Sequence, residues 1–150
     1  MFTEKIFDTG AIKINYAEGA PNGAPLVTLH GATARWQELN PLINELEKDW
    51  HIYACDKRGH GKSSWGNSYT SVTIAADMSD FIKNNIGEPT VLIGHSAGGG
   101  VIRESEAEFF HAHISNGKAV QIKEVGHLIH VDQLEQMVEL IQKWLKSNNT

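Results

Sequence analysis

The chain has 150 residues, of which 41% are hydrophobic and 21% charged, and its formal net charge at pH 7 is −5. This length corresponds to about one domain, residues 1–150, with enough apolar material to bury a core without disulfides or metal ions. The negative charge argues against nucleic acid, or an anionic membrane surface, as a partner.

Two antiparallel strands are predicted at the start of the chain, at residues 5–7 and 11–16, joined by a turn at residues 8–10. Within 11–16, apolar residues alternate with polar ones, as in a strand with one buried face. Residues 26–29 are apolar on both faces, which is typical of a strand in the middle of a parallel sheet.

Three further strands are predicted at residues 51–55, 90–93 and 119–125. The first two again have apolar residues on both faces, whereas the last alternates. Strands of this kind that alternate with helices indicate a parallel sheet covered on both sides.

Helices are predicted between the strands and at the C-terminal end. The pair Asn40-Pro41 suits the cap and first turn of one helix. Apolar residues recur at helical spacing over 72–86, and Gly87 suits a left-handed cap at its end. Asp132 and Glu135 suit the start of a last amphipathic helix. The chain therefore belongs to the α/β class, with a mostly parallel sheet, antiparallel N-terminal strands and helices on both faces.

The pentapeptide Gly94-His95-Ser96-Ala97-Gly98 lies between a predicted strand and the start of a predicted helix. In that context the pattern indicates a nucleophile elbow, a sharp turn that projects the Ser96 hydroxyl above the sheet. The following helix places backbone amides and a positive partial charge beside the hydroxyl. The alternative is a glycine-rich helix start with an incidental serine.

His30-Gly31-Ala32 follows the predicted strand 26–29, where a second oxyanion donor is needed. Acyl transfer requires two N–H groups aimed at the developing oxyanion. The N–H groups of Ala32 and Ala97 are the natural candidates. Taken alone, residues 30–32 are simply a turn.

Four segments together resemble the α/β-hydrolase superfamily, in the order in which that family has them. They are LHGATARWQEL (29–39), DKRGHGKSSW (56–65), VLIGHSAGGG (91–100) and GHLIHVDQLEQ (126–136). The resemblance implies Ser96 as nucleophile, His127 as general base, and Ala32 with Ala97 as the oxyanion hole. It also implies that Trp36 and residues 58–63 are structural or pocket-lining neighbours.

His127 follows the predicted strand 119–125, and its alternative interpretation is an exposed loop histidine. His95 is expected to pack beneath the elbow rather than react. The remaining histidines lack an accompanying cysteine or carboxylate cluster, so neither a metal site nor a cofactor is expected.

Only 31 positions separate Ser96 from His127. Members of the family place two more parallel strands, the catalytic acid and often a lid in that interval. We therefore expect a reduced fold that lacks the lid and about two strands. Glu104 and Glu106 are the candidates for an orienting acid, and their alternative is that of solvated helix carboxylates; Asp56 and Asp132 are weaker candidates still.

Loss of two strands would bring strand 119–125 beside the elbow strand, with His127 displaced or misdirected. Exchange of the C-terminal strand and helix between two chains is another solution, because the sheet otherwise exposes an edge. That solution predicts a homodimer.

The sequence predicts a serine hydrolase of esterase type that acts on small esters. A serine nucleophile excludes relatives that attack with aspartate, such as haloalkane dehalogenases and most epoxide hydrolases. The alternatives are an impaired or inactive scaffold, truncated or engineered, and a binding module that uses the elbow to hold an anion. The unpaired Cys55 and the absence of a signal-peptide pattern predict a cytoplasmic protein.

Overall fold

The computed structural model describes residues 1–101 and 134–148. Its strands are β1 (Thr3–Asp8), β2 (Lys13–Glu18), β3 (Pro25–Leu29), β4 (His51–Cys55) and β5 (Val91–Gly94). Its α-helices are α1 (Asn40–Leu46), α2 (Ser71–Phe81), α3 (Ala97–Gly100) and α6 (Leu134–Asn148). A 3₁₀ turn, η1 (Trp36–Leu39), precedes α1, and a π-helical turn, η2 (Ile82–Ile86), continues α2.

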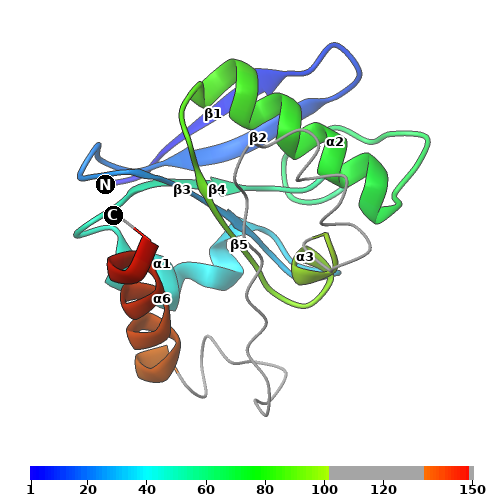
Figure 1. Cartoon of the computed structure of the whole chain (residues 1–150). Coiled ribbons are helices and arrows are strands. Elements are labelled where there is room, and N and C mark those ends of the chain that lie inside the picture. Colours follow the sequence, from blue (N-terminus) through cyan, green and yellow to red (C-terminus); the bar gives the residue numbers. More distant parts are fainter. Residues whose placement is uncertain (102–133, 149–150) are drawn as a thin grey trace.

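The described strands form one mixed sheet in the order β1-β2-β4-β3-β5 (Figure 1). β1 pairs with β2, and β2 with β4, in antiparallel fashion, whereas β3 runs parallel to both β4 and β5. The predicted α/β class, with a parallel centre and antiparallel N-terminal strands, is thus confirmed.

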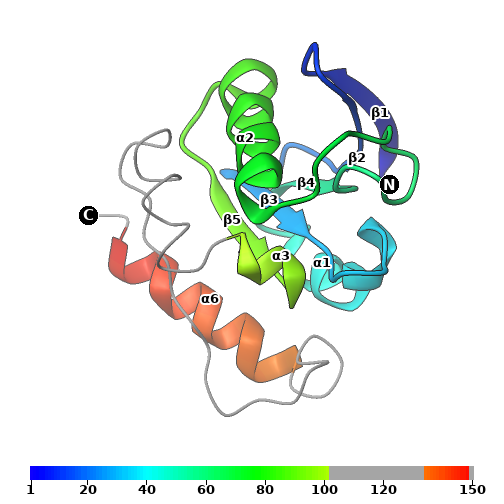
Figure 2. The same cartoon turned by 90° about the vertical axis from the view of Figure 1, so that its right-hand side faces the viewer.

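Helices cover both faces of this sheet, as predicted: Figure 2 shows α2 above it and α1 and α6 below it. On the α2 side, Met78 and Phe81 are fully buried against alternate residues of the strands, among them Ile14 and Leu29. On the other side, α1 and Met137 of α6 pack over a second apolar cluster that includes Leu26 and Ile52. The sheet therefore stands between two cores, which makes its strand ends a rigid platform.

Helix α2 and the turn η2 together cover the helix predicted over 72–86. The Thr70 side chain caps the helix by accepting a hydrogen bond from the Thr73 N–H at 3.2 Å. Gly87 closes the following turn in the left-handed conformation, with φ 73°. For α1 the predicted cap is wrong: Asn40 already has helical torsion angles, and Leu39 precedes it as the cap without a side-chain hydrogen bond.

Several predictions fall outside the described residues. They concern the strand 119–125, the general base His127 and the acid candidates Glu104 and Glu106. In the single chain, α6 packs against α1, and exchange of this helix between two chains stays a prediction. Across residues 1–101 and 134–148, no helix is long and apolar enough to cross a membrane.

Candidate active site

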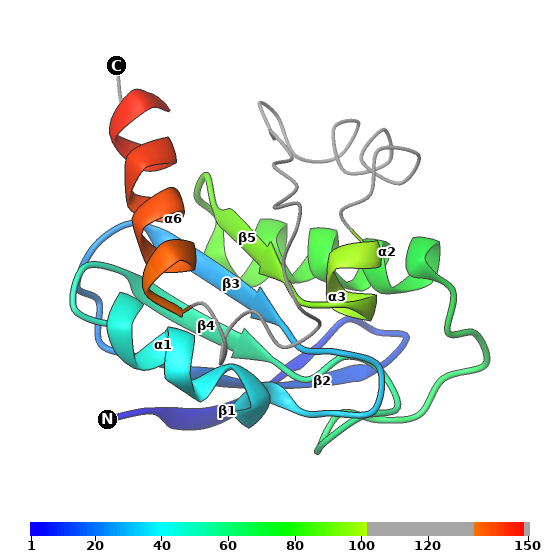
Figure 3. The same cartoon turned by 90° about the horizontal axis from the view of Figure 1, so that it is seen from below.

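The three parallel strands end at the same level. In the sheet register Leu29 of β3 lies opposite both Cys55 of β4 and Gly94 of β5. Figure 3 shows the arrowheads of β3, β4 and β5 pointing the same way, with α3 beginning just past β5. The loops that start at residues 30, 56 and 95 therefore leave the sheet side by side at its carboxyl edge, where α/β folds build their sites.

Ser96 sits in a strained turn between β5 and α3. Its torsion angles are φ 50° and ψ −114°, and it is the one residue other than glycine with positive φ in the described part of the chain. Its side chain is exposed at the sheet edge. A non-glycine residue held in such a conformation costs about 1–3 kcal/mol and is found mainly at functional sites.

Two glycines permit this turn to be so tight. A Cβ on Gly94 would lie 2.3 Å from the Gly98 carbonyl oxygen, and a Cβ on Gly98 would lie 2.4 Å from the Leu29 carbonyl oxygen. The start of α3 is therefore pressed against the ends of both β5 and β3. This is the predicted elbow geometry.

Hydrogen bonds hold the elbow to the neighbouring strand. The His95 N–H donates to the Leu29 carbonyl at 3.0 Å, and the Gly98 N–H donates to the His95 carbonyl at 2.8 Å. The His95 side chain is 6% exposed, so it packs beneath the turn as predicted. Ala97 opens α3, and an N–H in that place has no acceptor within the helix.

The carboxylate of Glu38 joins the elbow to the 30–32 turn. Its Oε2 accepts a hydrogen bond from the Gly31 N–H at 2.6 Å and lies 3.4 Å from Nδ1 of His95. A Cβ on Gly31 would come within 3.2 Å of this carboxylate and 3.3 Å of the His95 ring. The two turns that carry the proposed oxyanion donors are thus in contact through one side chain.

The carbonyl oxygen of Gly31 is bound by two other side chains. It accepts hydrogen bonds from Nδ1 of His30 at 2.8 Å and from Nζ of Lys57 at 3.0 Å. Nε2 of His30 accepts from the Lys57 N–H at 3.1 Å, so the ring is neutral with its proton on Nδ1. Both side chains are almost completely buried. Burial also lowers the pKa of Lys57, and the nearby carboxylate of Glu38 opposes that shift.

Stability is expected to depend on pH through His30. Burial lowers the pKa of this imidazole to about 4, against about 6.5 in an unfolded chain. Between these values the unfolded chain binds a proton that the folded chain does not, so the free energy of unfolding falls as the pH decreases. The contribution of this residue is at most about 3 kcal/mol, complete above pH 6.5 and lost by about pH 4.

Urea unfolding at about pH 7 and pH 4.5 checks this prediction. A His30→Asn variant retains a donor and an acceptor but does not titrate in this range. Its loss of stability between the two pH values should therefore be smaller than that of the wild type. Equal losses in the two proteins would contradict the prediction.

Asp56, weighed in the sequence as a distant candidate for the acid, is part of the scaffold. It is 1% exposed and accepts hydrogen bonds from the Trp36 N–H, the Asn15 side chain and the Lys62 N–H at 2.8 to 3.0 Å. Gly61 packs so closely on it that a Cβ there would lie 2.0 Å from Oδ2. The carboxylate therefore shapes the loop after β4 and has no free face for a catalytic role.

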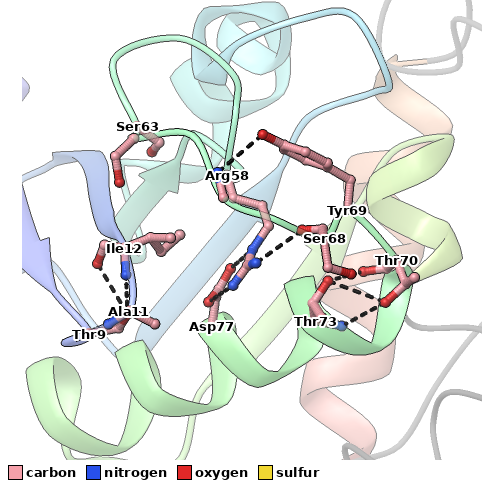
Figure 4. Close-up of polar contacts among 12 residues, drawn as sticks. Thr9, Ala11, Ile12, Arg58, Ser63, Ser68, Tyr69, Thr70, Thr73 and Asp77 are labelled. Atoms are coloured by element: carbon pink, nitrogen blue, oxygen red, sulfur yellow. Dashed lines mark hydrogen bonds and ion pairs between the residues drawn. The ribbon is translucent and has the colours of Figure 1, made fainter.

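Arg58 links the loop after β4 to α2 through an ion pair with Asp77. Its guanidinium forms two hydrogen bonds of 2.6 Å to the carboxylate of Asp77 and a third, of 3.0 Å, to the Ser68 carbonyl (Figure 4). The side chains are 10% and 4% exposed. The bidentate pair raises the pKa of Arg58 above its ordinary value. Arg58 thus acts as a structural neighbour of the site.

Beside the 30–32 turn lies an open cavity of about 480 Å³. It is lined by Thr33, Ala34, Arg35, Gln37, Glu38 and Gly61. Its lining combines charged and polar side chains with small residues.

The structure brings Ser96, Ala97 and Ala32 to one edge of the sheet, while His127 lies outside the described residues. Two side chains that the sequence interpretation passed over, Lys57 and Glu38, hold the same region together. A signal for Lys57 was present, since it lies two residues past the end of a buried strand, level with the elbow. Glu38 lies just before the helix predicted from Asn40 and carries no such signal.

The model of the alpha/beta hydrolase family matches residues 26–120 of the chain. Among curated proteins, the 2-(acetamidomethylene)succinate hydrolase of Mesorhizobium japonicum is 30% identical over 98 residues, which are 65% of this chain and 35% of that protein. A lipase of Mycobacterium tuberculosis is 31% identical over 60% of this chain and 34% of its own length. Epoxide hydrolase 4 of Mus musculus is 30% identical over 63% of this chain and 27% of its own.

Solved structures of similar proteins also superpose on this chain. The crystal structure of an E-2-(acetamidomethylene)succinate hydrolase superposes with a TM-score of 0.69 and 26% identity, over 76% of this chain and 42% of that one. An N-acyl homoserine lactonase superposes with a TM-score of 0.66 and 25% identity, over 76% and 42%. The chain thus spans about a third of the curated relatives and about two fifths of these two structures.

Proposed function

Because the chain belongs to the alpha/beta hydrolase family, we propose that it is a serine hydrolase that cleaves small esters through an acyl-enzyme on Ser96. The observation that carries the proposal is the strained, exposed Ser96 at the carboxyl edge of the sheet. A strained serine is maintained only where the surrounding structure over-determines it, and glycine would adopt the same turn without cost.

In the proposed reaction, Oγ of Ser96 attacks the ester carbonyl carbon and His127 accepts its proton. The N–H groups of Ala32 and Ala97 stabilise the negative charge on the carbonyl oxygen. Collapse of this intermediate expels the alcohol, which takes the proton from His127. A water molecule, deprotonated by His127, then releases the acid and restores the serine.

Serine chemistry favours carbonyl substrates. Among the relatives, the lipase and the lactonase carry names of carbonyl hydrolases, while others are named epoxide hydrolases. A serine at the nucleophile position supports grouping this chain with the carbonyl hydrolases.

A fluorophosphonate probe tests the nucleophile directly. The wild-type chain should gain the mass of one phosphonyl group, carried by the peptide that contains Ser96, and a Ser96→Ala variant should gain none. Absence of labelling in both proteins would reject the enzyme and favour an inactive scaffold. Labelling at another residue would reject Ser96.

The base is tested with p-nitrophenyl acetate. A His127→Ala variant should lose at least about tenfold in kcat if the imidazole transfers the proton, since general-base catalysis contributes about 10² to 10⁴. Unchanged kcat would remove His127 from this role and leave Ser96 in place.

A further inference from the structure

The peptide group between Gly31 and Ala32 accepts hydrogen bonds from two buried side chains at its carbonyl oxygen. Nζ of Lys57 and Nδ1 of His30 both donate to the Gly31 oxygen, at 3.0 and 2.8 Å. The peptide is trans, as are all peptide bonds that the structure describes. In a trans peptide the N–H points opposite to the C=O. The Ala32 N–H is therefore directed away from the buried lysine, on the exposed side of the turn.

We propose that Lys57 is a positioning residue of the oxyanion hole. Its ammonium orients and polarises the Gly31–Ala32 peptide. The Ala32 N–H is thereby positioned to donate a hydrogen bond to the oxyanion that forms when Ser96 attacks the carbonyl. This inference rests on the proposed function, and it assigns to the chain's own lysine the orientation of one oxyanion donor.

Burial of this ammonium has no explanation in packing. The Lys57 side chain is 2% exposed and is among the largest buried side chains of the described residues. An apolar chain of the same length fills that space without the cost of desolvating a charge. Besides its attraction to the nearby Glu38 carboxylate, the ammonium adds a charge-assisted hydrogen bond to the Gly31 carbonyl, which is stronger than a neutral one.

Polarisation follows from the same contact. A donor bound at the C=O end of a peptide withdraws electron density, which makes the N–H at the other end a stronger hydrogen-bond donor. The Gly31 N–H is held separately by Glu38, at 2.6 Å, so the residue is fixed on both sides. A peptide fixed in this manner needs no reorganisation when the oxyanion forms, which is the requirement for an effective oxyanion donor.

Lys57→Met removes the ammonium and retains an unbranched stem. With p-nitrophenyl acetate its kcat should fall about tenfold to hundredfold, less than loss of a whole oxyanion donor, with KM changed less than about twofold. Lys48→Met is the matched control. It precedes β4, whereas Lys57 follows that strand; its side chain is 65% exposed, and it pairs with Glu45 at the surface. Its kcat should stay within about twofold of the wild type.

A purely structural lysine would lower stability without this split between kcat and KM. The carbonyl ¹³C resonance of Gly31 and the amide resonance of Ala32 supply a second readout in isotope-labelled protein. Both should move in Lys57→Met and stay in place in Lys48→Met. If Lys57→Met does not fold, Lys57→Gln, which removes the charge and retains a polar end, should show the same loss and the same shifts.

Two results would overturn the inference: a kcat equal to that of the wild type in a folded Lys57 variant, or an Ala32 amide resonance that does not move. Failure of the proposed function is recognised separately. In that case the wild type shows no hydrolysis above Ser96→Ala, and the two resonances still decide whether Lys57 orients the peptide.

Discussion

Replacement of Ser96 by glycine is expected to abolish hydrolysis and to leave a more stable protein than replacement by alanine. Both variants lack the hydroxyl, so the rate with p-nitrophenyl acetate should fall about 10³-fold or more, to the background of the solution. They differ in the backbone. Alanine keeps the Cβ that strains a residue at φ 50° and ψ −114°, and glycine does not.

At an ordinary position glycine is about 0.5–1 kcal/mol less favourable than alanine. The strain at Ser96, about 1–3 kcal/mol, exceeds that difference, so Ser96→Gly should be more stable than Ser96→Ala by about 1 kcal/mol. Urea unfolding of the two variants measures the order. Ser79, inside α2, is the matched control, because there the alanine variant should be the more stable.

The hydrolysis rate tests whether Ser96 is the nucleophile, and urea unfolding tests whether its backbone is strained. Retained activity in either variant would mean that Ser96 is not the nucleophile. An alanine variant more stable than the glycine variant would mean that the turn holds no strain at this residue. A functional site is expected to lower the free energy of unfolding where a reactive side chain requires a strained backbone.

Replacement of Asp77 by alanine is expected to lower the free energy of unfolding by about 3–5 kcal/mol. The substitution leaves the Arg58 guanidinium buried without its bidentate partner, because the pair is 10% and 4% exposed. A loss of this size is a large part of the 5–15 kcal/mol that holds an ordinary domain. Arg58 also holds the loop after β4, so the variant should lose order next to the site.

Urea unfolding measures this loss against two controls. Glu45→Ala breaks the exposed pair with Lys48, whose side chains are 47% and 65% exposed, and should cost less than about 0.5 kcal/mol. The double variant Arg58→Met with Asp77→Leu replaces the ion pair by apolar side chains and should recover more than half of the loss. Equal costs for Asp77→Ala and Glu45→Ala would show that burial does not strengthen the pair.

Hydrophobic periodicity was enough to place the five described strands and α2. The segment 51–55 was predicted with the bounds that the structure has, and the others within about two residues at most boundaries. The start of α1 was missed because a distant contact sets it. The Trp36 N–H donates to Asp56, 20 residues away, and a 3₁₀ turn forms there and runs directly into the helix. Cap preferences describe local bonds and carry no information about such a partner.

The sequence by itself determined where the strained turn forms, because Gly94 and Gly98, which permit it, lie two residues before and after Ser96. What only the tertiary structure decided is which side chains surround that turn. Glu38 and Lys57 meet at Gly31 since β3, β4 and β5 end in register, with Leu29 opposite Cys55 and Gly94. Register is settled only when the buried faces of all three strands pack together against the two cores, so it depends on residues far apart in the chain.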